Sequence, residues 1–105
     1  MAQFDIFKNK DPRTKERTPY LMDVQANLLS TLATRVVVPL RAAAGAKGPA
    51  ITRLHPTIRI GNLDYIAVVS EMAAIPTGAL GSFVASAQQD RQLIVAATDL
   101  LLTGF

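Results

Sequence analysis

The chain contains no cysteine among its 105 residues. It therefore has no disulfide framework, no thiolate ligands for zinc and no cysteine nucleophile. A chain of this size without disulfides is typical of a reducing compartment, so we expect a cytoplasmic location. The single histidine, His55, precedes Pro56 and has no acidic neighbour in the sequence. Because a general base needs a group that orients it, this histidine alone does not indicate a catalytic site.

Catalytic motifs are missing as well. The sequence has no Gly-x-Ser-x-Gly elbow, and its Gly-Ala-Lys-Gly segment at 45–48 lacks the spacing and the following Ser or Thr of a phosphate-binding loop. No segment groups the His, Cys, Asp and Glu residues that a metal site requires. The residues therefore predict a small binding or interaction protein that is not an enzyme and has no metal or cofactor.

Long hydrophobic runs are also absent. The longest apolar stretch covers residues 93–97, and Thr98 and Asp99 interrupt it before three further leucines. This is too short to span a bilayer. The first seven residues also lack the basic region and apolar run of a secretory signal. We expect no membrane association.

Charge is concentrated in one segment, residues 8–17, which we call the basic loop. The net charge of the chain is only +3. The loop contains two acidic residues, Asp11 and Glu16, and five basic ones: Lys8, Lys10, Arg13, Lys15 and Arg17. Prolines at 12 and 19 favour a loop. Since no aromatic residues alternate with the basic ones to stack on bases, we expect no sequence-specific binding of nucleic acid.

Apolar residues are abundant enough for one core: Leu, Ile, Val and Phe make up 31 of the 105 residues. Alternation predicts a strand at 3–7, with Phe4 and Ile6 on one face, and a second at 20–25, so that the basic loop joins a hairpin. Three valines predict a strand at 34–40, ended or placed at an edge by Pro39.

In the middle of the chain, the sequence predicts short secondary-structure elements and loops. Residues 41–49 are rich in Ala and Gly and predict a loop, followed by a small strand at 51–54. A hairpin is predicted from 57–61 and 64–70, with its turn at Gly61 and Asn62. Another short element, 72–76, ends in a proline.

The C-terminal third changes to helical periodicity. Ser86 and Gln89 have the spacing of a capping box, and a stripe follows at Leu93, Ile94, Ala97, Leu100 and Leu101. Val95 and Leu102 lie off this stripe, which predicts burial on two sides, one against the sheet and one against a second subunit. Gly104 is a natural helix stop. The predicted fold is mainly β (α+β), an antiparallel sheet closed by a C-terminal helix.

Six strings, taken together, carry a resemblance to a known family. They are QF at 3–4, DVQANLL at 23–29, RVVVPL at 35–40, LHPTIRIG at 54–61, EMAAIP at 71–76 and the glycine Gly104. In this order and spacing they resemble the CcdB family, the gyrase-poisoning toxins of toxin–antitoxin modules. The resemblance spans the chain, so residues 1–105 are expected to form a single CcdB-like toxin domain.

The resemblance implies a fold and two macromolecular partners. The fold is an SH3-like barrel or curved antiparallel sheet with a small wing sheet and a long C-terminal helix, assembled as a homodimer. The function is to bind the gyrase A subunit and trap gyrase on cleaved DNA. A CcdA-like antitoxin with a disordered segment removes the toxin. Such a poison needs to bind one conformation of gyrase better than the others and need not catalyse a reaction.

The resemblance also implies site residues. The family's gyrase contact lies in its last three residues, archetypally Trp-Gly-Ile, which places Thr103, Gly104 and Phe105 in that role. Phe105 retains an apolar terminus, whereas Thr103 stands where the family has tryptophan. Leu28 and Leu29 match an aliphatic pair of the gyrase surface, and Asp99 replaces an asparagine of the same helix face.

Two further sets of residues follow from the resemblance. The antitoxin contacts the family's toxins at the segment that corresponds here to Lys8, Lys10, Arg13 and Lys15, and an acidic antitoxin would suit it. Leu100 and Leu101 are assigned to the core and the dimer interface. Other interpretations stay open at this stage: Gly104 as a helix cap only, and Leu28 and Leu29 as ordinary buried residues.

Two other functions also remain open. One is an endoribonuclease toxin, because the MazF and Kid toxins share this barrel and fold does not fix function. The other is a homologue that folds and binds antitoxin but no longer poisons gyrase, which the threonine at 103 keeps open.

Overall fold

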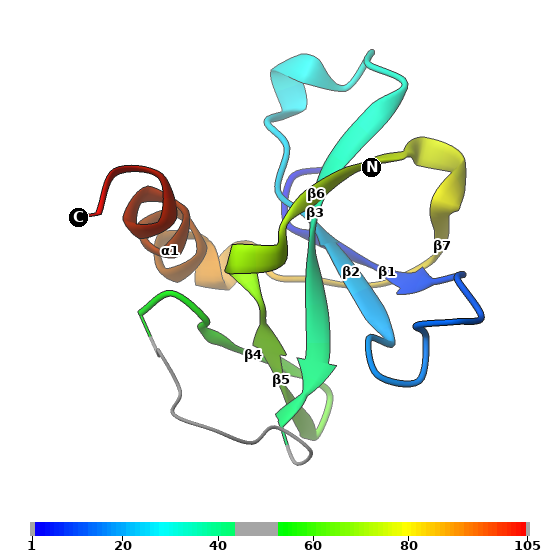
Figure 1. Ribbon diagram of the computed structural model, residues 1–105, viewed down its shortest axis with the longest axis horizontal. Helices are drawn as coiled ribbons and strands as arrows, with labels where there is room; N and C mark the ends of the chain where they lie inside the picture. Colours follow the sequence, from blue (N-terminus) through cyan, green and yellow to red (C-terminus); the bar gives the residue numbers. More distant parts are fainter. Residues whose placement is uncertain (1, 44–52, 105) are drawn as a thin grey trace.

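The computed structural model describes residues 2–43 and 53–104, which form one sheet and one long helix. The strands are β1 (Asp5–Asn9), β2 (Tyr20–Asp23), β3 (Thr34–Ala42), β4 (Thr57–Ile60), β5 (Leu63–Ala67), β6 (Ala73–Pro76) and β7 (Leu80–Ser86). The helix is α1 (Arg91–Thr103), and the short 3₁₀ turns include η1 (Asn27–Leu29), η3 (Val69–Glu71), η4 (Thr77–Ala79) and η5 (Gln88–Asp90). Figure 1 shows β3 as the long central strand, with α1 at one side of the sheet.

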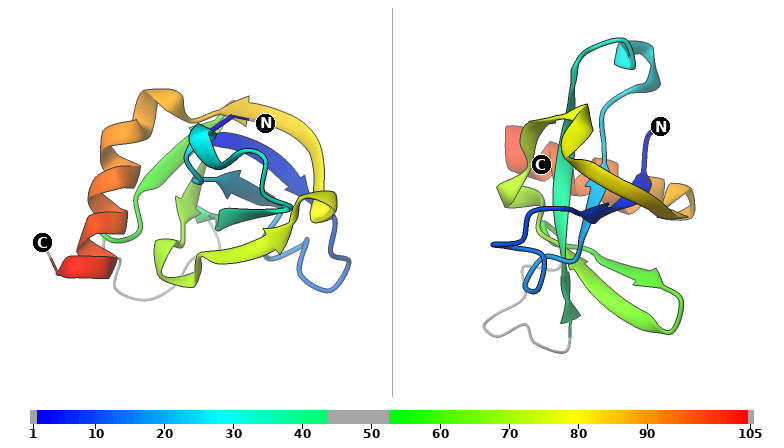
Figure 2. Two further views of the ribbon diagram at one scale, coloured as in Figure 1. Left: turned by 90° about the horizontal axis from the view of Figure 1, so that it is seen from above. Right: turned by 90° about the vertical axis from the view of Figure 1, so that its right-hand side faces the viewer.

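All strand pairs are antiparallel, in the order β4-β5-β3-β2-β1-β7, and β6 also pairs with β3. The strands β6 and β7 lie at two ends of this arrangement, yet only the three residues of η4 join them. The sheet must therefore curl back on itself, and Figure 2 shows this half-barrel. The predicted class, mainly β with a curved SH3-like sheet and a C-terminal helix, is confirmed. The small sheet is the β4–β5 hairpin, continuous with the main sheet through β3.

The prediction that Pro39 ends its strand, or lies at an edge, is wrong. Strand β3 continues to Ala42, and Pro39 is paired with Leu21 of β2 on one side. On its other side, β3 pairs with β6 through Val37 and with β5 from Leu40 onward. Proline lacks an N–H donor, so it fits the point at which the strand changes partners.

The first strand begins two residues later than predicted. Phe4 has a φ of 71°, in the left-handed region that bulky residues rarely adopt, so regular strand geometry starts at Asp5. Its N–H donates to the carbonyl oxygen of Asp23, and its ring is buried. Ile6 and Phe7 are both buried, on opposite faces of the strand, because the curled sheet encloses a cluster on each side.

The hairpin β4–β5 is confirmed, with Gly61 at a positive φ of 62° in the turn, although β5 ends at Ala67 and the predicted residues 69 and 70 belong to η3. The short element that ends at Pro76 is the strand β6. The small strand predicted at 51–54 is not a strand where it is described, because residues 53 and 54 form a turn; 51 and 52 lie outside the described residues. Of the loop predicted at 41–49, residues 41 and 42 belong to β3, and 44–49 lie outside the described residues.

The main core lies between the sheet and α1. Its buried members include Phe4, Ile6, Met22, Val38, Leu40, Ile58, Ala67, Val69, Ile94 and Ala97. A smaller cluster of Phe7, Val37 and Leu80 occupies the other side of the sheet, with Leu21 and Ile75 packed against it. The helix therefore covers one face, and the opposite face remains available for other contacts.

The helix starts later than the capping box predicted. The Ser86 hydroxyl accepts the N–H of Gln88 at 3.2 Å, which stabilises η5, and α1 begins only at Arg91. The stop at Gly104 is confirmed: its φ of 80° is left-handed, and its N–H donates to the Leu100 carbonyl. No helix among the described residues is long and apolar enough to cross a membrane.

Candidate functional site

The end of α1 is exposed, as a binding tail requires. Thr103 and Gly104 are both exposed, and the Thr103 hydroxyl donates to the Asp99 carbonyl at 2.7 Å. Asp99 is exposed one turn earlier. The predicted tail residue Phe105 lies outside the described residues. The left-handed conformation of Gly104 turns the chain out of the helix at this point.

The helix leaves apolar side chains uncovered. Only Ile94 and Ala97 are fully buried against the sheet. Leu93 is 54% exposed and Leu102 is 72% exposed, whereas Leu100 is half-buried and Leu101 is 37% exposed. The prediction of one buried stripe is therefore wrong for Leu93, because the buried face of the helix is turned toward Val95 and Thr98, which are partly buried. Exposed leucines on two flanks of α1 leave room for further contacts.

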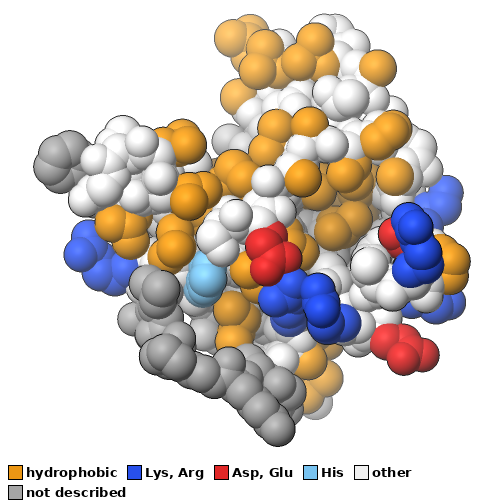
Figure 3. All heavy atoms as spheres, in the orientation of Figure 1, with side chains coloured by type: hydrophobic (Ala, Val, Ile, Leu, Met, Phe, Trp, Pro, Cys, Tyr) orange, Lys and Arg blue, Asp and Glu red, His pale blue; other side chains and the backbone are white. Residues whose placement is uncertain are grey.

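A second apolar surface lies on the loop between β2 and β3, residues 24–33, which we call the leucine loop. Leu28 is 90% exposed, Leu29 46% and Leu32 49%. Hydrophobic side chains gather over this loop in the space-filling view (Figure 3). The interpretation of Leu28 and Leu29 as ordinary buried residues is therefore wrong, and Leu32, which the sequence analysis missed, extends the surface.

Within one chain, the two predicted gyrase-binding groups do not form one patch. Figures 1 and 2 both show the leucine loop at one end of the molecule and the end of α1 at a distance from it. Thr103, Gly104 and Asp99 lie together, and Leu28 and Leu29 lie together. A partner that touches both groups must therefore span a large part of one chain or contact two chains.

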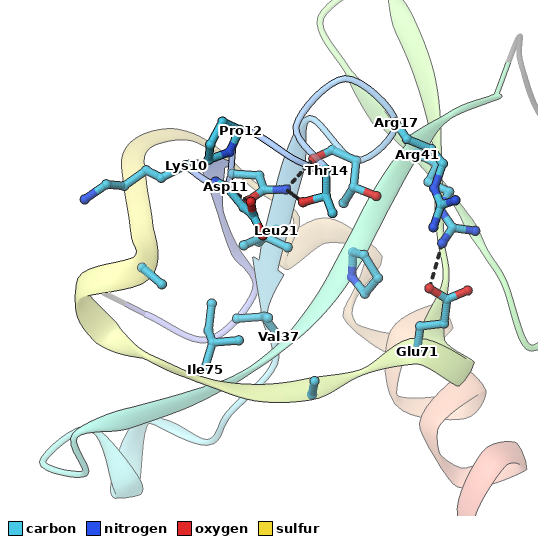
Figure 4. A pocket seen from close by; sticks show the side chains of 15 residues that line it. Lys10, Asp11, Pro12, Thr14, Arg17, Leu21, Val37, Arg41, Glu71 and Ile75 are labelled. Atoms are coloured by element: carbon cyan, nitrogen blue, oxygen red, sulfur yellow. Dashed lines mark hydrogen bonds and ion pairs between the residues drawn. The ribbon is translucent and has the colours of Figure 1, made fainter.

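The basic loop lies beside a groove of about 660 Å³ on the sheet face opposite α1. The apolar floor includes Leu21, Val37, Pro39 and Ile75, from strands β2, β3 and β6. Figure 4 shows Leu21, Val37 and Ile75 beneath the basic loop. The sequence analysis missed this groove, because it exists only after the sheet curls and brings three strands around it.

Charged residues surround the groove. Lys10, Asp11, Arg17, Arg41 and Glu71 all line it. Arg41 and Glu71 form an ion pair at 2.6 Å, drawn as a dashed line in Figure 4. Two acidic residues accompany three basic ones, so the lining keeps an excess of positive charge.

The basic side chains of the basic loop differ in whether an ion pair within the chain neutralises them. The backbone N–H of Arg13 donates to Asp11, and its guanidinium lies 3.3 Å away; together they lower the pKa of the Asp11 carboxyl. Asp11 is thus charged at neutral pH and offsets Arg13. Within residues 2–43 and 53–104, neither Lys10 nor Arg17 forms an ion pair. Lys10 instead donates to the Gly78 carbonyl at 3.1 Å.

The remaining predicted antitoxin residues are exposed. Lys8 lies on β1 and Lys15 lies in the turn that follows; both are exposed, and neither lines the groove. Arg17 and Arg41 were not predicted as site residues. Arg17 belongs to the same basic run, so the charge pattern contained it, whereas Arg41 reaches the groove only through the pairing of β3.

Among the described residues, the lone histidine forms no ion pair with a carboxylate. His55 Nε2 lies 2.9 Å from the hydroxyl of Ser70, a polar pair near η3. No group of three or more His, Cys, Asp or Glu side chains that could hold a metal occurs in the described part of the chain.

Comparison with known proteins adds two findings. A family model described as "CcdB protein" matches residues 3–104. Among solved structures, the chain is similar to an endoribonuclease in complex with its cognate antitoxin from a mycobacterial species. The two are 13% identical with a TM-score of 0.71, over 97% of this chain and 94% of that chain. At this identity the likeness shows a shared fold.

Proposed function

The chain belongs to the CcdB family, the toxins of toxin–antitoxin modules, and on this premise we propose that it binds the gyrase A subunit and traps gyrase on cleaved DNA. The observation that carries the proposal is the family match over residues 3–104, which includes the helix end, the leucine loop and the basic loop. The match thus covers all three of these surfaces.

The exposed surfaces fit a poison that acts by binding. Such a protein stabilises one conformation of gyrase by binding it more tightly than the others. Burying a leucine side chain contributes about 1.5–3 kcal/mol, and Leu28, which is 90% exposed, is available for this. Catalysis by this chain is not required, and the action takes place in the cytoplasm where gyrase works.

Direct binding tests the proposal. The intact protein is titrated into the purified dimerisation domain of gyrase A, and the heat of binding is recorded by calorimetry. We expect a saturable complex. Absence of binding by a folded sample, with gyrase from its own host, would contradict the proposal.

We propose that a second copy of this chain packs on the partly exposed side of α1 at Leu100 and Leu101. The exposed leucines of this helix provide the apolar area that a dimer interface requires. A dimer would also supply a second copy of both the leucine loop and the tail. A gyrase surface assembled from two chains would explain why one chain does not unite the two groups.

The dimer is tested by a charge on this flank. Leu100→Glu places a carboxylate in the proposed apolar interface. We therefore expect the dimer dissociation constant to rise at least tenfold, which corresponds to a loss of about 1.4 kcal/mol or more in the free energy of association. Sedimentation equilibrium measures it. The control is Leu63→Glu, because Leu63 is exposed on the β4–β5 hairpin, away from α1. A variant of Leu100 that stays fully dimeric contradicts this interface.

The proposed antitoxin site is the basic loop together with the groove beside it. A disordered segment with acidic and apolar side chains fits both parts: carboxylates reach Lys10 and Arg17, and an apolar side chain enters the groove over Leu21 and Ile75. The excess of positive charge would steer such a segment to the site. Lys8 and Lys15 add to this field from the loop surface, whereas the charge of Arg13 is offset by Asp11.

Charge reversal in the groove lining is expected to weaken antitoxin binding. The double variant Lys10→Glu and Arg17→Glu should lower the affinity at least tenfold, mainly through slower association at low salt. Surface plasmon resonance with a purified antitoxin peptide measures both the association rate and the dissociation rate. Arg59→Glu serves as the control, because Arg59 lies on β4 and is exposed. Equal affinities for all three proteins would contradict the site.

Cleavage of RNA is the alternative function, because a structurally similar protein is an endoribonuclease. The groove then takes RNA, and Arg17, Arg41 and Glu71 are its charged residues. The test incubates the purified protein with total RNA. Defined cleavage products would favour this alternative, and intact RNA together with gyrase binding would favour the poison.

A further inference from the structure

The leucine loop displays apolar side chains that the chain itself does not cover. Its 3₁₀ turn η1 contains no buried residue, and Leu28, Leu29 and Leu32 are all exposed. Val24, at the start of the loop, packs against the main core, whereas residues 26–33 are all exposed, so burial of their own side chains does not fix the shape of this part. What holds it must lie at its base, where β2 ends and β3 begins (Figure 1).

A buried ion pair closes this base. Asp23 is the last residue of β2 and Arg35 the second of β3, and their side chains are 0% and 1% exposed. The Arg35 Nε and Nη2 atoms lie 2.8 and 2.6 Å from the same oxygen, Oδ2 of Asp23. The other oxygen, Oδ1, accepts the backbone N–H of Gln25 at 3.0 Å. One carboxylate thus ties together both ends of the loop.

Gln25 extends this network into the loop. Its side chain is almost wholly buried, and its Nε2 donates to the Leu29 carbonyl at 2.9 Å. Its Oε1 accepts the N–H of Val36 at 3.1 Å. The amide therefore joins the turn that carries Leu28 to the start of β3.

The N-terminal segment, which is not part of the loop, donates two hydrogen bonds to it. The backbone N–H of Gln3 donates to Asn27 Oδ1 at 2.7 Å, and Gln3 Nε2 donates to the Val24 carbonyl at 3.1 Å. The polar contacts at the loop base thus come from three parts of the chain.

We propose that Asp23, Gln25 and Arg35 are positioning residues, which hold the leucine loop in the one conformation that presents Leu28, Leu29 and Leu32 to gyrase. This inference rests on the proposed function. A buried ion pair adds little net stability compared with apolar residues of the same size, so specificity of conformation is a better reason for its presence here. A loop ordered before binding loses less conformational entropy when the partner arrives.

The test uses Gln25→Met, which keeps the volume of the side chain and removes both amide bonds. Gln89→Met is the matched control, because Gln89 is exposed in η5. We expect Gln25→Met to lower the affinity for the gyrase A dimerisation domain at least tenfold. Amide hydrogen exchange should quicken in residues 26–33 alone, and the affinity for an antitoxin peptide at the basic loop should change less than twofold.

Other outcomes overturn the inference in distinguishable ways. Leu28→Ala and Leu29→Ala are measured beside it. If they weaken gyrase binding while Gln25→Met does not, the loop binds gyrase but the network does not position it. If they leave gyrase binding unchanged, the loop is not a gyrase contact. If the unaltered protein does not bind gyrase A, the proposed function itself fails. A loss of antitoxin binding equal to that of gyrase binding would show a general structural defect instead.

Discussion

Replacing Arg35 by methionine is expected to lower the free energy of unfolding by about 3–5 kcal/mol, because Asp23 then remains buried with an uncompensated charge. The pair is almost completely inaccessible to solvent, and both guanidinium contacts go to one carboxylate oxygen. Small domains have only about 5–15 kcal/mol of stability in total. Urea unfolding followed by circular dichroism measures the change.

The matched control for Arg35 is the exposed pair of Arg13 and Asp11, in which the arginine side chain is 87% accessible. Arg13→Met should change stability by less than about 1 kcal/mol, since exposed ion pairs contribute little. Replacing both buried partners, as Asp23→Leu with Arg35→Met, should recover part of the loss, because no charge is then left unpaired. A loss below about 1 kcal/mol for Arg35→Met alone would contradict the role given to the buried pair.

Deleting residues 103–105 is expected to abolish toxicity and to lower the affinity for gyrase A at least a hundredfold, which corresponds to about 2.7 kcal/mol. Thr103 and Gly104 are exposed, so we expect their removal to leave the core intact. The measurement is the growth of cells that express the shortened protein, with calorimetric titration against the gyrase A fragment.

Two controls separate loss of the tail from loss of the fold. Antitoxin affinity at the basic loop should be unchanged in the shortened protein, because that surface lies on the sheet face opposite α1. Gly104→Ala, which keeps the chain length, strains the left-handed residue at a cost of about 1 kcal/mol. Full toxicity of the shortened protein would rule out the tail as the gyrase contact. If toxicity persisted together with RNA cleavage, the endoribonuclease alternative would be favoured.

Local patterns predicted most of the fold. The hairpin around Gly61, the valine strand and the helix stop at Gly104 each depend on neighbouring residues, and each is confirmed. The errors at Phe4 and Pro39 share one physical reason. Both residues meet constraints from other strands, an unusual φ in one case and a change of pairing partner in the other. Alternation of side chains along one segment does not contain such information.

The candidate site was predicted less completely. Exposure of Leu28 and Leu29, and of the basic loop, agrees with the surfaces that the family resemblance implied. The groove and the network of Asp23, Gln25 and Arg35 were missed, because they arise only when β2 and β3 are paired in register. The opposite charges at 23 and 35 were visible in the sequence, but nothing in the local pattern placed them in contact.

Whether this chain traps gyrase on cleaved DNA is measured by a DNA-cleavage assay. The purified protein is mixed with gyrase, ATP and supercoiled plasmid, then treated with detergent and protease, and the DNA is separated on a gel. We predict linear DNA from the intact protein and none from the protein that lacks residues 103–105. No linear DNA from a folded sample, tested against gyrase of its own host, would contradict the account.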